Sequence, residues 1–185
     1  DKAYEEFNSI VGLKLDEKPI LVDDIEYTAF EITDLKHEVT RIIDGSPAIW
    51  LAEQQVDLYE VTLRLHNWAD PTSEPYKAKE IDVNKAKVSV AASKEELRNG
   101  LYNLHNEIMQ LQDKYEMAAQ AVNMTQEDFR IKELQYQLGM LSKQEYLAAQ
   151  LALTEAETNF NNIKYAHEYL KQAFYKPWAI TAGAV

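Results

Sequence analysis

The chain has 185 residues, enough for one domain or one elongated unit. It contains only five glycines and five prolines, which favours helices over a loop-rich or β-sandwich fold. With 19 Lys and Arg residues against 31 Asp and Glu residues, the net charge is −12, so the sequence lacks the basic face that nucleic-acid binding requires. The absence of cysteine excludes disulfides and thiolate metal sites.

No stretch reaches the roughly 18–20 consecutive apolar residues of a membrane-spanning helix, and no signal peptide is recognisable. The chain opens at Asp1 and not at a methionine. We therefore expect it to be a processed or trimmed piece of a longer protein.

The first 44 residues predict two short helices joined by an extended segment. Residues 1–11 have the pattern of the last turns of a helix, with Gly12 at the position after its end. The segment 13–24 is expected to be extended, because Pro19 bars a regular helix. A second short helix is predicted from about 34 to 44.

A third helix is predicted over roughly 47–67. Ser46 is its expected cap, and Pro47 occupies its first helical position. The helix runs into NWADPTSEP, a polar stretch rich in proline that predicts a linker.

The main feature is a very long helix predicted from about 76 to 138. Apolar or small residues recur there with spacings of 4 and 3, which is a heptad seam held for about seven repeats. At about 1.5 Å per residue, such a helix is on the order of 90 Å long. The seam residues are Val83, Ala86, Val90, Ser93, Leu97, Leu101, Leu104, Ile108, Leu111, Tyr115, Ala118, Val122, Thr125 and Phe129.

A tight, capped turn is predicted over 138–142. Leu138 is the expected end of the long helix, and Gly139 supplies the left-handed residue that commonly follows a helix end. Ser142 and Glu145 form the S-x-x-E pattern of a capping box, which starts a return helix. A turn this short folds the two helices into an antiparallel hairpin.

The return helix is predicted over about 143–176, with Pro177 as its stop. It has a heptad seam of its own, and both helices of the hairpin are therefore expected to meet along their full common length. The seam residues are Tyr146, Ala149, Leu153, Ala156, Phe160, Ile163, His167, Leu170 and Phe174.

Helix lengths then predict an all-α fold of elongated antiparallel hairpins. The return helix covers the long helix only back to about residue 105, and helix 47–67 covers its other end up to about residue 96. Two shorter helices should therefore lie nearly end to end along one long partner, with their ends meeting near Asn99 and Gly100. We expect residues 1–185 to form a single unit, in which 1–44 pack around that junction and 45–185 form the hairpins.

No pattern in the sequence favours an enzyme, a cofactor or a metal site. The pair most similar to metal ligands, Asp34 and His37 at helical i, i+3 spacing, is expected to belong to a solvated helix. His167 lies in a seam and is expected to be a packed residue with a hydrogen-bond partner. No G-x-S-x-G motif, phosphate-binding glycine loop or cysteine nucleophile occurs.

Apolar residues outside the seams indicate further partners. Leu147, Leu151 and Tyr165 lie off the main seam of the return helix, and a two-helix rod is too thin to bury them alone. The partner helices would come from missing sequence or from other copies. The tyrosines of the hairpin either fill helix–helix seams or face a neighbouring protomer or a passage.

The stretch LQYQLGMLSKQEYLAAQLALTEAETNFNNIKYAHEYLKQA, residues 134–173, resembles the TolC / outer membrane efflux protein family. Members carry a long helix ending in Y-x-x-G, a tight turn to Ser, and then E/D-x-L-x-A-x-x-x-L-x-x-A. Here YEEFNSIVGLKL resembles the ending of the family's first half, and SPAIWLAEQQVDL resembles the start of its second half. The matching positions are Tyr136, Gly139, Ser142, Glu145, Leu147, Ala149, Leu153, Ala156, Tyr165 and Ala166.

The resemblance implies a second structural repeat of a protein that trimerises into an α-helical tunnel in the extracytoplasmic cell envelope, in the periplasm or the cell-wall zone. It implies that the tip docks a periplasmic adaptor (membrane fusion) protein. The resemblance places Glu145 at a position where the family has an acidic ring. A role as helix cap explains this residue equally well. The implied docking residues are Tyr136, Leu138, Gly139, Ser142 and Glu145.

Two features depart from the family pattern. Between the helices corresponding to 47–67 and 76–138 the family inserts two membrane-crossing β-strands of about 9–11 residues each. Only NWADPTSE is available here, and the hairpin of the family's first repeat is also missing. The chain is therefore expected to be a relative without these strands or an edited chain, and its outer-membrane association stays open.

The leading hypothesis is a TolC-like helical component of an export or efflux system that acts by assembly, without catalysis. The alternative is a structural coiled-coil scaffold or adaptor of the cell envelope that encloses no channel. A stable trimer or larger ring in solution would favour the tunnel, whereas a monomeric or dimeric rod would favour the scaffold.

Overall fold

The computed structural model describes residues 2–20, 25–66 and 74–181, and all regular secondary structure in these ranges is helical. The predicted all-α fold is thus confirmed for the described part of the chain. The helices are α1 (Lys2–Val11), α2 (Leu35–Asp44), α3 (Pro47–His66), α4 (Glu74–Gln137), α5 (Lys143–Tyr175) and α6 (Pro177–Thr181).

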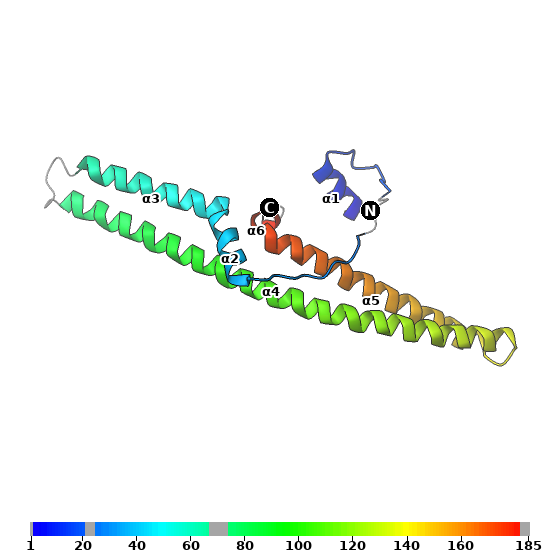
Figure 1. Ribbon diagram of the computed structural model, residues 1–185. Helices are drawn as coiled ribbons and strands as arrows, with labels where there is room; N and C mark the ends of the chain where they lie inside the picture. Colours follow the sequence, from blue (N-terminus) through cyan, green and yellow to red (C-terminus); the bar gives the residue numbers. More distant parts are fainter. Residues whose placement is uncertain (1, 21–24, 67–73, 182–185) are drawn as a thin grey trace.

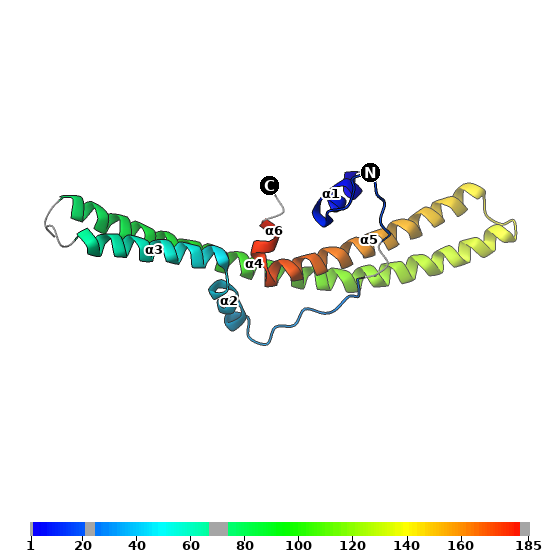
Figure 2. The same cartoon turned by 90° about the horizontal axis from the view of Figure 1, so that it is seen from above.

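The molecule is a long rod built on α4, which has 64 residues (Figure 1). In both views α3 runs beside one half of α4 and α5 beside the other half (Figure 1, Figure 2). The predicted arrangement of two shorter helices along one long partner is therefore confirmed, with helix ends within about two residues of the predicted ones. The predicted linker after α3 falls largely on residues 67–73, which lie outside the described residues.

The predicted seam of α5 and the part of the α4 seam that follows about residue 100 form the contact between these two helices, whereas the earlier part of the α4 seam lies beside α3. Every seam residue predicted on these helices is buried or half-buried. The ring of Tyr115 on α4 lies 4.9 Å from that of Phe160 on α5, and the rings of Phe129 and Tyr146 lie 5.7 Å apart. These pairs fix an antiparallel register, in which later residues of α5 meet earlier residues of α4.

A second hairpin joins α3 to the other half of α4. Two ion pairs cross between these helices, from Lys87 to Glu60 and from Lys94 to Glu53, each with an N–O distance of 2.6 Å. All four side chains are partly exposed, so solvent screens both pairs and they contribute little to stability. They orient α3, and the apolar side chains between the helices provide most of the stability.

The hydrophobic core lies where the two hairpins meet. There α2 packs on α4 (Figure 2), and its apolar side chains join those of α4 and Phe174 of α5 in one cluster. The core therefore lies close to Asn99 and Gly100, where the junction was predicted. Its buried members are Phe30, Val39, Ile42, Ile43, Leu101, Ile108 and Phe174.

The end of α5 carries a feature that the sequence did not reveal. Pro177 ends α5 as predicted, but it also begins the short helix α6, because proline fits the first position of a helix. Trp178 of α6 packs against the hydrophobic core at the junction.

Residues 1–44 pack around the junction only in part. Residues 25–44 do so, whereas α1 stands off the rod in both views (Figure 1, Figure 2). The buried side chain of Asn8 donates hydrogen bonds to the carbonyl oxygens of Lys14 at 2.8 Å and Glu17 at 2.7 Å. The loop after α1 is thereby folded back onto the helix, and within the described residues the Oδ1 atom of Asn8 is buried without a hydrogen-bond partner.

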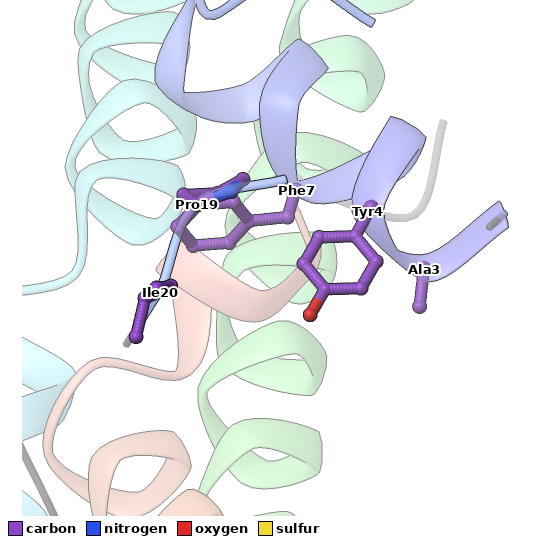
Figure 3. A pocket seen from close by; sticks show the side chains of 5 residues that line it. All are labelled: Ala3, Tyr4, Phe7, Pro19 and Ile20. Atoms are coloured by element: carbon purple, nitrogen blue, oxygen red, sulfur yellow. The ribbon is translucent and has the colours of Figure 1, made fainter. Parts of the chain in front are cut away.

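The folded-back loop places apolar side chains beside those of α1. Side chains from both segments line an open pocket of about 550 Å³ beside the helix (Figure 3). The lining residues are Ala3, Tyr4, Phe7, Pro19 and Ile20. As predicted, the helix ends before Gly12, which has the left-handed φ of +79°.

Candidate docking tip and outer stripes

We call the α4–α5 hairpin the distal hairpin and the α3–α4 hairpin the proximal hairpin. The tip of the distal hairpin is a helix stop of the Schellman type. Gly139 has a φ of +73°, and its N–H donates to the Tyr136 carbonyl at 2.9 Å. The N–H of Met140 donates to the Gln135 carbonyl at 2.8 Å, which completes the pair of bonds that defines this stop. A Cβ on Gly139 would meet nothing within 4 Å, so glycine is required by its backbone conformation and not by crowding.

The return helix starts with the predicted capping box. The Ser142 hydroxyl accepts a hydrogen bond from the Glu145 N–H at 3.3 Å, and the Glu145 carboxylate accepts one from the Ser142 N–H at 3.0 Å. Hydrogen bonds from the Ser142 side chain and then from its backbone lower the pKa of Glu145. Glu145 is therefore a carboxylate at neutral pH and, in this structure, acts as a helix cap.

Apolar side chains are exposed around this turn. The ring of Tyr136 stacks on that of Tyr146, with centroids 4.7 Å apart. Leu138 and Met140 are 74% and 75% exposed. The turn thus brings the predicted residues Tyr136, Leu138, Gly139, Ser142 and Glu145 together at one end of the rod, and it adds Met140, whose exposure the sequence did not reveal.

A stripe of apolar residues runs along the outside of α4, and we call it the α4 outer stripe. Its members recur every seven residues, which places them on one face of a helix. Their exposed fractions lie between 50% and 75%. They are Met117, Met124, Ile131 and Leu138. A scan for a second seven-residue repeat, one position before the main seam, would have found them in the sequence.

A second stripe, the α5 outer stripe, runs along the return helix. Leu147, Leu151 and Tyr165 are exposed here, as expected from their positions off the main seam, and Tyr169 continues the same side. Of the tyrosines of the hairpin, Tyr115 and Tyr146 fill a seam as expected, whereas Tyr165 and Tyr169 are exposed.

The proximal hairpin carries a stripe as well. Leu51, Leu58 and Leu65 on α3 recur every seven residues and are 62–71% exposed. Beside α3, the outer side of α4 exposes Ile81 and Val88, also seven residues apart. Apolar stripes therefore extend over both halves of the rod.

The described residues offer no metal site and no membrane-spanning helix. Asp34 serves as the cap of α2 and accepts a hydrogen bond from the His37 N–H at 3.0 Å. No group of three or more potential ligands gathers anywhere in residues 2–20, 25–66 and 74–181. No helix within these ranges combines the length and the hydropathy that crossing a membrane requires.

One expectation about a histidine was wrong. His167 is fully buried, as its place in the seam predicted, but neither of its ring nitrogens has a hydrogen-bond partner among the described residues. Burial and the cation of Lys171 lower the pKa of His167. The imidazole is therefore neutral at pH 7.

Comparison with protein-family models, curated proteins and solved structures gave no match for this chain.

Proposed function

We propose that this protein is a helical component of a cell-envelope export or efflux system, similar to the TolC family, that acts by assembly and without catalysis. Copies associate side by side through the outer stripes, and the tip docks a partner protein. The observation that carries the proposal is the exposure of heptad-spaced apolar residues on the outside of both helices of the hairpin. Contiguous exposed apolar side chains of this kind mark protein–protein contacts.

The two distal stripes favour a head-to-tail contact between copies. At about 100° per residue, the α5 outer stripe points away from α4, and the α4 outer stripe lies roughly 120° from the side that faces α5, so the two stripes lie on different outer sides of the antiparallel hairpin. A copy that exposes a different apolar surface on each of two sides can contact two neighbours. Such contacts close into a ring or extend as a filament. A closed ring of three is the assembly that the family resemblance implies.

Solution mass tests the assembly directly. We expect the protein to sediment as a trimer or larger ring at micromolar concentration. Met124→Glu places a charge in the α4 outer stripe and should weaken association at least tenfold. Gln126→Glu is the matched control, because it adds the same charge to an exposed position of the same helix, two residues after Met124 and therefore on the other side from the stripe. A monomer at all concentrations, or equal effects of both variants, would refute this assembly.

The tip supplies the second half of the proposal. Leu138 and Met140 project from a turn whose backbone is fixed by hydrogen bonds, so a partner can bind them without ordering the loop. We expect Leu138→Glu to abolish binding of a periplasmic adaptor protein in a calorimetric titration. The capped turn should survive this change, as measured by unchanged helicity. Full binding by Leu138→Glu would contradict docking at the tip.

A structural scaffold of the cell envelope is the second candidate. It is favoured by the single uninterrupted helix α4, which spans both hairpins and suits a rigid spacer. A monomeric or dimeric rod that binds envelope proteins at both ends would support the scaffold and exclude the ring.

A further inference from the structure

Residues 25–33 run as an extended strand-like segment across the α4–α5 hairpin, and we call them the strap (Figure 1). The ring of Tyr27 lies flat on that of Tyr115, with centroids 3.7 Å apart and planes within 6°. The N–H of Phe30 donates to the Gln112 side-chain oxygen at 3.1 Å. Phe30 itself belongs to the hydrophobic core, so the strap is anchored at that end.

A lysine of α5 holds the middle of the strap. The ammonium group of Lys171 donates to the Thr28 carbonyl at 3.0 Å and also to the Thr28 hydroxyl. It pairs with Glu168 on its own helix at 2.8 Å. Because Lys171 is only 8% exposed, these bonds replace water around a nearly buried cation.

His167 lies directly under the strap. Its ring centroid is 4.8 Å from that of Tyr27, and its side chain is completely buried. Neither ring nitrogen has a hydrogen-bond partner in the part of the chain that the structure describes, and this part offers no acceptor for the second proton of an imidazolium. A charge formed here would be buried and unpaired, which is strongly unfavourable.

The charged and titratable neighbours of His167 further destabilise a positive charge on its imidazole. On α5, Lys171 lies one turn ahead of His167 and the mostly buried Lys164 lies just under one turn behind. The single carboxylate beside it on that helix, Glu168, is already hydrogen-bonded to Lys171 and Gln172.

The facing elements contribute two phenols and one carboxylate. Tyr27 of the strap and Tyr115 of α4 form the stack, and Glu116 lies near enough to act on Tyr27. Burial, Tyr115 and Glu116 raise the pKa of Tyr27, so that phenol stays neutral. His105 of α4 contacts the other end of the strap, with its ring 5.9 Å from that of Phe30.

We propose that His167 is an acid-sensitive latch: protonation of its imidazole releases the Tyr27–Thr28 end of the strap from the hairpin, while Phe30 stays in the hydrophobic core. Release lets water reach the imidazolium and relieves its repulsion with Lys171. The strap is part of the chain that connects α1 to α2, so its release frees the α1 unit to move farther from the rod. It also uncovers the aromatic pair Tyr115 and Phe160.

The direction of the pH effect follows from proton linkage. His167 in the closed strap binds a proton more weakly than an exposed histidine, whose pKa is about 6.5. The closed state is therefore fully stable above pH 6.5 and loses stability as the pH falls below it. One proton is taken up on opening, so the opening equilibrium rises by up to about tenfold per pH unit within this window.

A fluorescent label on the strap tests the latch. The chain has no cysteine, so Ala29→Cys, at an exposed strap position, creates a single attachment site. We expect the anisotropy of the dye to fall between pH 7.5 and 5, while far-UV circular dichroism shows the rod still helical. His167→Phe should remove this change, because the phenyl ring fills the same space without titrating.

His105→Phe is the matched control, because it changes a histidine at the anchored end of the strap. It should leave the pH response in place. If His167→Phe fails to fold, His167→Gln supplies a neutral side chain at every pH and should also abolish the response. A flat wild-type profile, or an unchanged response in a folded His167 variant, would overturn the latch.

Discussion

Two glycines of the distal hairpin should respond to the same substitution with opposite signs. Gly139 lies at φ +73°, where an alanine costs about 1–2 kcal/mol. Alanine also lowers the conformational entropy of the unfolded chain, which stabilises the folded state by about 0.4–1 kcal/mol. The net effect of Gly139→Ala should therefore be a destabilisation of about 1 kcal/mol. Gly100 is within α4, and a Cβ there meets nothing within 4 Å. Gly100→Ala should therefore stabilise the helix by about 0.5–1 kcal/mol.

Guanidinium unfolding followed by far-UV circular dichroism measures both changes. The two variants should differ by about 2 kcal/mol, which corresponds to roughly 4–8 °C in Tm for a chain of this size. Because Gly139 is at the end of the rod, Gly139→Ala should also accelerate amide exchange at the backbone N–H groups of residue 139 and Met140. A Gly139→Ala protein at least as stable as the wild type would refute the left-handed turn.

Three further changes test the core, the cap and the strap. Ile108→Ala removes a fully buried side chain from the hydrophobic core and should lower the unfolding free energy by about 2–5 kcal/mol in the same denaturation assay. Ser142→Ala removes the cap of α5 and should lower it by about 1 kcal/mol. Since the pKa of Glu145 is lowered, the stabilisation from its carboxylate is present above its usual pKa and is lost as the pH falls through the lowered value. Wild type should therefore lose more stability in acid than Glu145→Gln, as measured by Tm against pH. Lys171→Met leaves the Thr28 carbonyl without its donor and should lower the anisotropy of the strap label at every pH.

The hairpins could be predicted from the sequence because their signals are local. Seam residues such as Leu101 and Ile108 recur at spacings that one helix alone defines, and all of them are buried or half-buried in the structure. The tip was equally local, since Gly139 and the Ser142–Glu145 box stop and start helices within a few residues.

The strap could not be predicted for the opposite reason. Its partners Gln112 and Lys171 are 82 and 143 residues away in the sequence from the strap residues that they bind. No spacing within residues 25–33 indicates which groove they occupy. The position of α1 was missed because Asn8 ties the following loop to the helix, a side-chain contact that no periodic pattern reports.

Because α4 is shared by both hairpins, its length sets the length of the whole molecule. The 64 residues of α4 span about 96 Å, so the distance between the two ends is set by residue count. Removing one heptad from α4, with a matching heptad from its shorter partner, would shorten the reach by about 10 Å and keep every remaining side chain on its face. A structure that bound both ends of the molecule at once would therefore need binding sites separated by about this length.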